Sequence, residues 1–189
     1  AADLQQACHD KPSDVPEALR LSLQDIHHST WFKLDPDQDQ TVTTARGTRP
    51  GSPLADLGFN LLMARIMHQL EAGLQQLPHY ARGCELLGTA VPPISWVDDL
   101  AIPLAVAEAH LMIPLVQDTT ALLHATFNAH GMTMNFEQGK SEAVIMYRGP
   151  GANACRTALF DTETAPCIVT ATDTHILTLK VVATSKHLG

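Results

Sequence analysis

The sequence is poor in aromatic and charged residues and has few cysteines. Aromatic side chains make up 5% of its 189 residues and charged ones 17%, while 45% are hydrophobic. A chain of this length and apolar content can bury a sizeable core, so we expect one folded domain, or most of one, and not a disordered segment. No segment recurs at a fixed period, which excludes solenoids and other repeat architectures.

Basic residues are also scarce, because 12 Lys and Arg stand against 20 Asp and Glu and the formal net charge is −8. Proteins that hold nucleic acid normally carry a basic footprint for the phosphates. A nucleic-acid function therefore has to rest on local motifs and not on overall charge.

The four cysteines, at positions 8, 84, 155 and 167, lie far apart and form no C-x-x-C pair. This spacing suggests neither a zinc site nor a small disulfide framework. It favours free thiols in an intracellular protein, without indicating which compartment.

No long apolar run suits a membrane. The most apolar one, residues 100–116, contains a glutamate, a histidine and two prolines, so we expect no membrane span. The first residues lack the basic and apolar regions of a signal peptide and do not begin with Met. We expect the chain to be a piece of a longer protein.

Apolar residues at helical spacing predict three helices, over residues 14–28, 53–77 and 105–129. Ser52 and Pro53 are suited to the N-cap and first position of the second helix. Pro114 is expected to kink the third helix, and Gly131 to end it.

Short β-branched and apolar runs between polar turns predict strands. They are expected at residues 31–34 and 41–45, at two sites within 94–103, and at 132–136, 142–147, 167–172 and 175–182. Helices mixed with antiparallel strands in this way predict an α+β fold.

Two familiar ligand loops, a calcium loop and a phosphate loop, are excluded because one or two of their required residues are replaced. Asp35, Asp37 and Asp39 alternate as in a calcium loop, but Gln40 stands where the sharp turn needs Gly, and Arg46 stands where the loop needs Glu. The later G-K-S sequence is no phosphate loop, because a methionine replaces the required earlier glycine. A solvated turn is the better interpretation of both.

Asp98 and Asp99 are adjacent within the apolar stretch ISWVDDLAIP, residues 94–103. Two neighbouring carboxylates repel each other, and burying either one unpaired costs several kcal/mol. A divalent hard cation such as Mg²⁺ would offset both effects. Taken alone, however, an Asp pair at a hairpin tip is more often a simple turn, because Asp favours turns.

Four segments, taken in order, resemble reverse transcriptases, most closely those of non-LTR retrotransposons and group II introns. They are RGTRPGSPLADLGFNLLM (46–63), WVDD (96–99), HGMTMNFEQGKSEAVIM (130–146) and KHLG (186–189). The resemblance covers roughly residues 46–189. It implies a polymerase palm, an antiparallel sheet packed with helices, whose fingers, first catalytic strand and thumb lie outside these residues.

The resemblance also divides the chain. It implies a leading helix and hairpin (1–45), a template and nucleotide loop with its helix (46–77), a catalytic hairpin (94–103), a helix with a lysine turn (104–147) and strands to a primer grip (167–189).

The resemblance implies that Asp98 and Asp99 hold Mg²⁺ or Mn²⁺, two ions in the complete enzyme, with Lys140 near the leaving pyrophosphate. The reaction would be RNA-directed DNA synthesis, a nucleotidyl transfer onto a primer 3′-hydroxyl. The partners would be an RNA or DNA template, a DNA primer and a dNTP. By the same resemblance, template and nucleotide are contacted by Arg46, Gly47, Arg49, Pro50, Gly51 and Ser52, and the primer by Trp96, Leu188 and Gly189.

The chain departs from the family at several positions. None of Asp3, Asp10, Asp14 and Asp25 is followed four residues later by Phe or Tyr, as the family's first catalytic aspartate is. We therefore expect the isolated chain not to polymerise. A tryptophan also replaces the usual Tyr or Phe of the aspartate motif, and a proline replaces the Gln that commonly precedes the loop glycine.

Two alternatives stay open. The chain could be a non-catalytic retroelement remnant, or a module that binds nucleic acid or protein. It could also be an unrelated α+β domain whose Asp pair is a turn.

Overall fold

The computed structural model describes residues 17–18, 21, 31–33, 41–43, 53–82, 92–96, 99–137, 140–161, 165–172 and 175–182. It divides the chain into two compact units, residues 1–67 and 68–189. Helices and small sheets are mixed, so the α+β class is confirmed at that level. Within the described residues, no helix is long and apolar enough to cross a membrane.

The first unit contains the expected early hairpin. Strands β1 (Trp31–Lys33) and β2 (Thr41–Thr43) pair antiparallel, with Phe32 opposite Val42. Of the helix predicted over 14–28, only positions 17, 18 and 21 are described, and they are helical.

Helix α3 (Pro53–Leu74) begins at the predicted proline and continues into the second unit. Proline suits a first helical position because the N–H that it lacks would have no partner there. Leu70 and Leu74 are fully buried. Between them Gly73 lets α3 approach the next long helix closely, because a Cβ at this position would lie 2.8 Å from Leu122 Cδ1.

Helix α4 (Met112–Ala129) starts later than predicted. Ala105, expected to begin the helix, instead belongs to strand β6 (Leu104–Ala105), which pairs with β3 (Ala81–Arg82). A short 3₁₀ turn η2 (Ala109–Leu111) precedes the helix. The predicted kink at Pro114 is therefore wrong. Proline is the third residue of α4, where an N–H has no partner within the helix, so it is accommodated without breaking a hydrogen bond.

Gly131 ends α4 as predicted. Its φ of 73° is left-handed, and its N–H donates to Asn128 O at 2.9 Å, while Met132 N–H donates to Phe127 O at 3.0 Å. This pair of hydrogen bonds is a Schellman motif, which satisfies carbonyls that the helix end leaves free. Just before it, His130 Nε2 lies 2.8 Å from the Gln69 side-chain oxygen, joining α4 to α3.

The largest sheet holds three strands in the order β7 (Glu142–Val144), β9 (Ile176–Val182), β8 (Cys167–Ala171). β8 runs antiparallel to β9, but β7 runs parallel to it, so the expectation of antiparallel pairing throughout is wrong. A parallel pair needs a crossover, which here contains α5 (Ala152–Phe160), a helix that the sequence patterns did not predict. Residues 132–136, expected to be a strand, form none.

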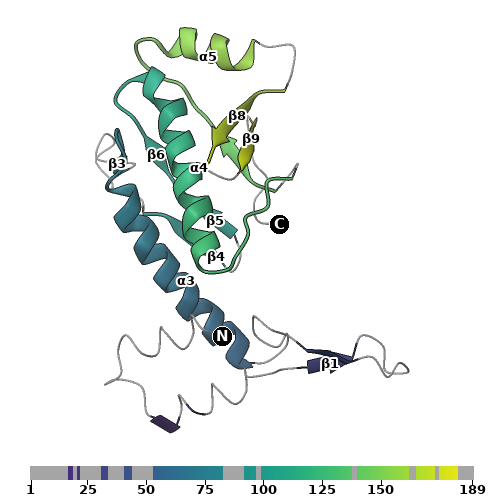
Figure 1. Ribbon diagram of the computed structural model, residues 1–189. Coiled ribbons are helices and arrows are strands. Elements are labelled where there is room, and N and C mark those ends of the chain that lie inside the picture. Colours follow the sequence, from purple (N-terminus) through teal and green to yellow (C-terminus); the bar gives the residue numbers. More distant parts are fainter. Residues whose placement is uncertain are drawn as a thin grey trace. The chain divides into compact units, whose positions relative to one another are not determined.

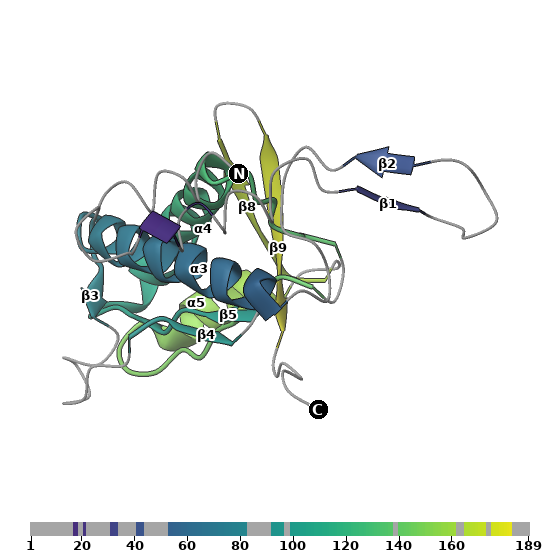
Figure 2. The same cartoon turned by 90° about the horizontal axis from the view of Figure 1, so that it is seen from below.

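Alternate residues of β8 and β9 are buried, and α4 packs against β8 (Figure 1, Figure 2). Ile168, Leu179 and Val181 form the core with Val116 of α4. Beside this core, the Gln117 side-chain amide donates to Val169 O at 2.7 Å. Helix and sheet are thus held together both by apolar burial, roughly 1.5–3 kcal/mol for each large side chain, and by a hydrogen bond at the sheet edge.

Candidate metal-binding hairpin and lysine turn

The predicted aspartate hairpin is present. Strands β4 (Ile94–Trp96) and β5 (Asp99–Ala101) pair antiparallel, and the register places Trp96 opposite Asp99. Val97 and Asp98 connect them in the sequence and lie outside the described residues. The prediction of two short strands around the aspartates is confirmed.

Asp99 lies on the solvent face of this hairpin. Its side chain is exposed, as are those of Ile94 and Ala101, whereas Ser95 and Leu100 are half-buried. Alternate residues of a strand point to opposite faces, so the apolar neighbours of Asp99 do not surround its carboxylate. Asp99 is therefore not a buried carboxylate that needs a cation to offset desolvation, and that expectation is wrong for Asp99. Asp98 lies outside the described residues, so the same expectation stays a prediction there.

Lys140 lies in a tight turn that leads into β7. Its N–H donates to Glu137 O at 3.1 Å, and its side chain is exposed. The Asn135 side-chain oxygen accepts the Glu137 N–H at 2.8 Å, and the Ser141 hydroxyl donates to Asn135 O at 2.6 Å. Asn135 thus folds the turn locally, as Asn commonly does, and the Lys140 side chain is exposed at this turn.

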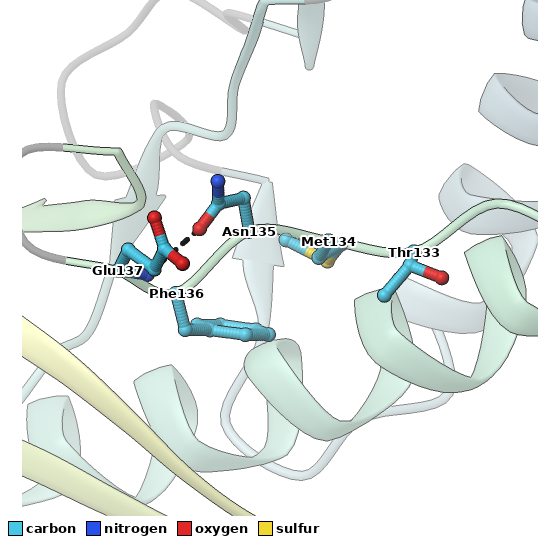
Figure 3. A pocket seen from close by; sticks show the side chains of 5 residues that line it. All are labelled: Thr133, Met134, Asn135, Phe136 and Glu137. Atoms are coloured by element: carbon cyan, nitrogen blue, oxygen red, sulfur yellow. Dashed lines mark hydrogen bonds between the residues drawn. The ribbon is translucent and has the colours of Figure 1, made fainter.

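An open hollow lies directly before this lysine (Figure 3). It is lined by Thr133, Met134, Asn135, Phe136 and Glu137. Phe136 points away from Asn135 and packs on the core. The hollow follows a single stretch of chain, so it is a surface depression beside the turn and not an enclosed binding cavity.

Most other predicted site residues lie outside the described residues. These are Arg46, Gly47, Arg49, Pro50, Gly51, Ser52, Asp98, Leu188 and Gly189. In the described part of the chain, no three His, Cys, Asp or Glu side chains group closely enough to hold a metal ion. Of the predicted site residues, the structure describes Trp96, Asp99 and Lys140, and the roles of all of them stay predictions.

Two groupings in the structure have no counterpart in the sequence motifs. Tyr147 is buried, and its backbone oxygen accepts a hydrogen bond from Arg156 at 3.2 Å. Burial, and to a lesser extent the charge of Cys155, raises the pKa of the Tyr147 hydroxyl. In addition, His124 and His175 come into ring contact. His124 and His175 are far apart in the sequence, so no local signal indicates their contact.

Comparison with known proteins adds no relative, since no family model, curated protein or solved structure matches this chain.

Proposed function

We propose that this chain is the palm-domain part of an RNA-directed DNA polymerase of the non-LTR retrotransposon or group II intron type. The observation that carries the proposal is the β4–β5 hairpin, in which a W-V-D-D sequence joins two paired strands and Trp96 stands opposite Asp99. A hairpin keeps adjacent carboxylates near one tip, where ions and substrates can reach them.

The chemistry of the proposal is nucleotidyl transfer. A primer 3′-hydroxyl attacks the α-phosphate of a dNTP, and two Mg²⁺ or Mn²⁺ ions about 4 Å apart stabilise the attacking and leaving oxygens. Asp98 would be the more direct ligand and Asp99 the supporting one. The exposure of Asp99 supports this role, because a catalytic carboxylate has to leave coordination positions open to the substrate.

Lys140 would act on the leaving group. Its exposed ammonium follows a turn fixed by Asn135, so it can approach the pyrophosphate and neutralise the charge that develops there. The loop of residues 46–52 would contact template and dNTP, and Trp96, Leu188 and Gly189 would contact the primer. The palm-like arrangement of the sheet belongs to the same proposal.

The exposed apolar side chains on the sheet face away from α4 favour a second candidate, a protein-binding module. Val144, Val169 and Ile176 are exposed on this sheet. If Asp98 and Asp99 bind no metal ion, the protein-binding module becomes the better supported function.

Paramagnetic NMR can test the metal-binding part of the proposal on the isolated chain. Mn²⁺ broadens nearby amide signals even when it binds weakly, so a site with only some of its ligands is still detectable. We expect broadening to appear first around Asp98 and Asp99 and to be relieved in Asp98→Asn and Asp99→Asn. Asp35→Asn and Asp37→Asn, at positions between β1 and β2 in the sequence, are matched controls and should leave it unchanged. Broadening that the hairpin substitutions do not alter would contradict the proposal.

A further inference from the structure

Strand β8 is the last strand of its sheet, and its outer edge has no neighbouring strand among the described residues (Figure 1). In an antiparallel ladder, alternate residues bond to the partner strand and the others turn away from it. Val181 N–H of β9 donates to Pro166 O, directly before β8, at 2.9 Å, so every second residue from position 166 turns toward β9. The N–H and C=O groups of Cys167, Val169 and Ala171 therefore point outward, away from β9.

One of these outward backbone groups has a hydrogen-bond partner within the described part of the chain. The Gln117 side-chain amide, on α4, donates to Val169 O at 2.7 Å. The other outward N–H and C=O groups are left for a further strand, because the edge of a sheet is a template for pairing. Cys167, Val169 and Ala171 are all exposed, so a strand can reach them.

Strand β8 has none of the features that usually keep an edge strand from pairing. Lysine, proline or a bulge is the common protection. The strand reads CIVTA, without a charged residue or a proline. Its register with β9 runs without interruption from Cys167 to Ala171, so there is no bulge. The protection of this edge therefore depends on Gln117.

The outer edge of β8 is complementary to a second copy of itself. An antiparallel pair with a two-fold axis at Val169 places Val169 opposite its own copy, and Cys167 opposite Ala171 of the other copy. All of these positions turn outward, so each outward N–H meets an outward C=O. The facing side chains are uncharged, so no like charges meet. Such a pair would join two three-stranded sheets into one.

We propose that the outer edge of β8 is a pairing surface for a second copy of this chain and that Gln117 blocks it. Val169 O is the central acceptor of this pairing, and in the single chain it accepts the Gln117 amide. An incoming strand has to compete for this oxygen and displace a half-buried side chain. One hydrogen bond of each copy therefore opposes dimerisation, and its removal opens the edge. The proposal does not depend on the function of the aspartate hairpin.

Sedimentation equilibrium of the full chain, with its thiols kept reduced, tests the role of Gln117. Gln117→Ala removes the donor, and Gln117→Met removes it while keeping a long side chain in case the first variant does not fold. We expect each to dimerise with a dissociation constant at least about ten-fold below that of the wild type, because two hydrogen bonds no longer oppose the dimer. Gln75→Ala, at an exposed position just after α3, is the matched control and should sediment like the wild type.

A second substitution tests where the copies meet. Val169→Lys in the Gln117→Ala chain should abolish the dimer, because the two-fold axis places the two lysines opposite each other. Thr178→Lys in the same chain is the control, since Thr178 is exposed on β9, away from the edge, and the dimer should persist.

Two results would overturn the proposal. One is a Gln117→Ala or Gln117→Met chain that is folded by circular dichroism and dimerises no more than the wild type. The other is a dimer that persists in Gln117→Ala/Val169→Lys, because the copies would then meet elsewhere. Neither result affects the aspartate hairpin, which is tested separately with Mn²⁺.

Discussion

Trp96 and Asp99 are cross-strand partners in the β4–β5 hairpin, and the Asp99 carboxylate lies on the exposed face. A solvated carboxylate contributes little to folding. Asp99 is therefore free to serve a ligand without a cost in stability.

Asp99→Asn should change the free energy of unfolding by no more than about 0.5 kcal/mol, as expected for an exposed side chain. Urea denaturation measures this, with Asp118→Asn, an exposed position in α4, as the control. A loss above about 1.5 kcal/mol in Asp99→Asn alone would show that the carboxylate has a structural role.

Asn135→Ala should destabilise the chain by about 1 kcal/mol, because the Glu137 N–H loses its partner in the turn. Asn153→Ala, at an exposed position in α5, is the matched control and should have almost no effect. Equal denaturation midpoints for the two variants would mean that the Asn135 hydrogen bond does not stabilise the turn that carries Lys140.

Ile168→Ala should cost about 2–5 kcal/mol, since this side chain is 2% exposed in the core of the second unit. Its neighbour Val169 is 48% exposed on the opposite face, so Val169→Ala should cost well under half as much. Similar losses in both variants would contradict the register of β8 against α4.

Because Tyr147 is buried, we expect the folded chain to lose stability at alkaline pH. Burial, with a smaller effect of Cys155, raises the pKa of Tyr147 above its ordinary value of 10.0. As the pH rises, the Tyr147 hydroxyl loses its proton in the unfolded chain before it does in the folded chain. The contribution of Tyr147 to folding stability is therefore complete below pH 10 and is lost as the pH rises through the folded-state pKa. Urea midpoints between pH 8 and about 11 should fall less steeply in Tyr147→Phe than in the wild type or in Tyr80→Phe. An unchanged slope in Tyr147→Phe would contradict this.

Local sequence signals predicted the elements that depend on local chemistry. Pro53 marks the start of α3, Gly131 the end of α4, and the polar residues between β1 and β2 mark a hairpin. The elements that were predicted wrongly depend on pairing between distant parts of the chain. Ala105 was predicted to begin a helix, but it belongs to β6, which pairs with β3, and pairing between strands distant in the sequence leaves no periodic signal.

The parallel pairing of β7 with β9 and the presence of α5 could not be predicted from the sequence either. The parallel pairing of β7 with β9 depends on how the chain crosses over through α5. This helix lies between Gly151, at a φ of 77°, and a polar stretch, which together have the pattern of a loop.

The candidate site was predicted only in part from the sequence. The motif order predicted a hairpin at the aspartates and a turn at Lys140, and both are present. The exposure of Asp99 could not be predicted, because apolar neighbours along a strand do not reveal which face a side chain occupies. The contact between His124 and His175 needs the folded structure, since α4 and the β8–β9 turn are distant in the sequence.

The isolated 189 residues should not extend a primer, because the resemblance implies that the fingers, the first catalytic strand and the thumb lie outside them. The proposed polymerase activity therefore has to be measured on a longer polypeptide that contains these residues together with those parts. The assay is dNTP incorporation on an RNA template with a DNA primer and Mg²⁺. We expect templated primer extension that is lost in Asp98→Asn and kept in Asp37→Asn. Primer extension that survives Asp98→Asn would contradict a polymerase role for this hairpin. So would a wild-type or Asp37→Asn polypeptide that binds template and primer but does not extend the primer.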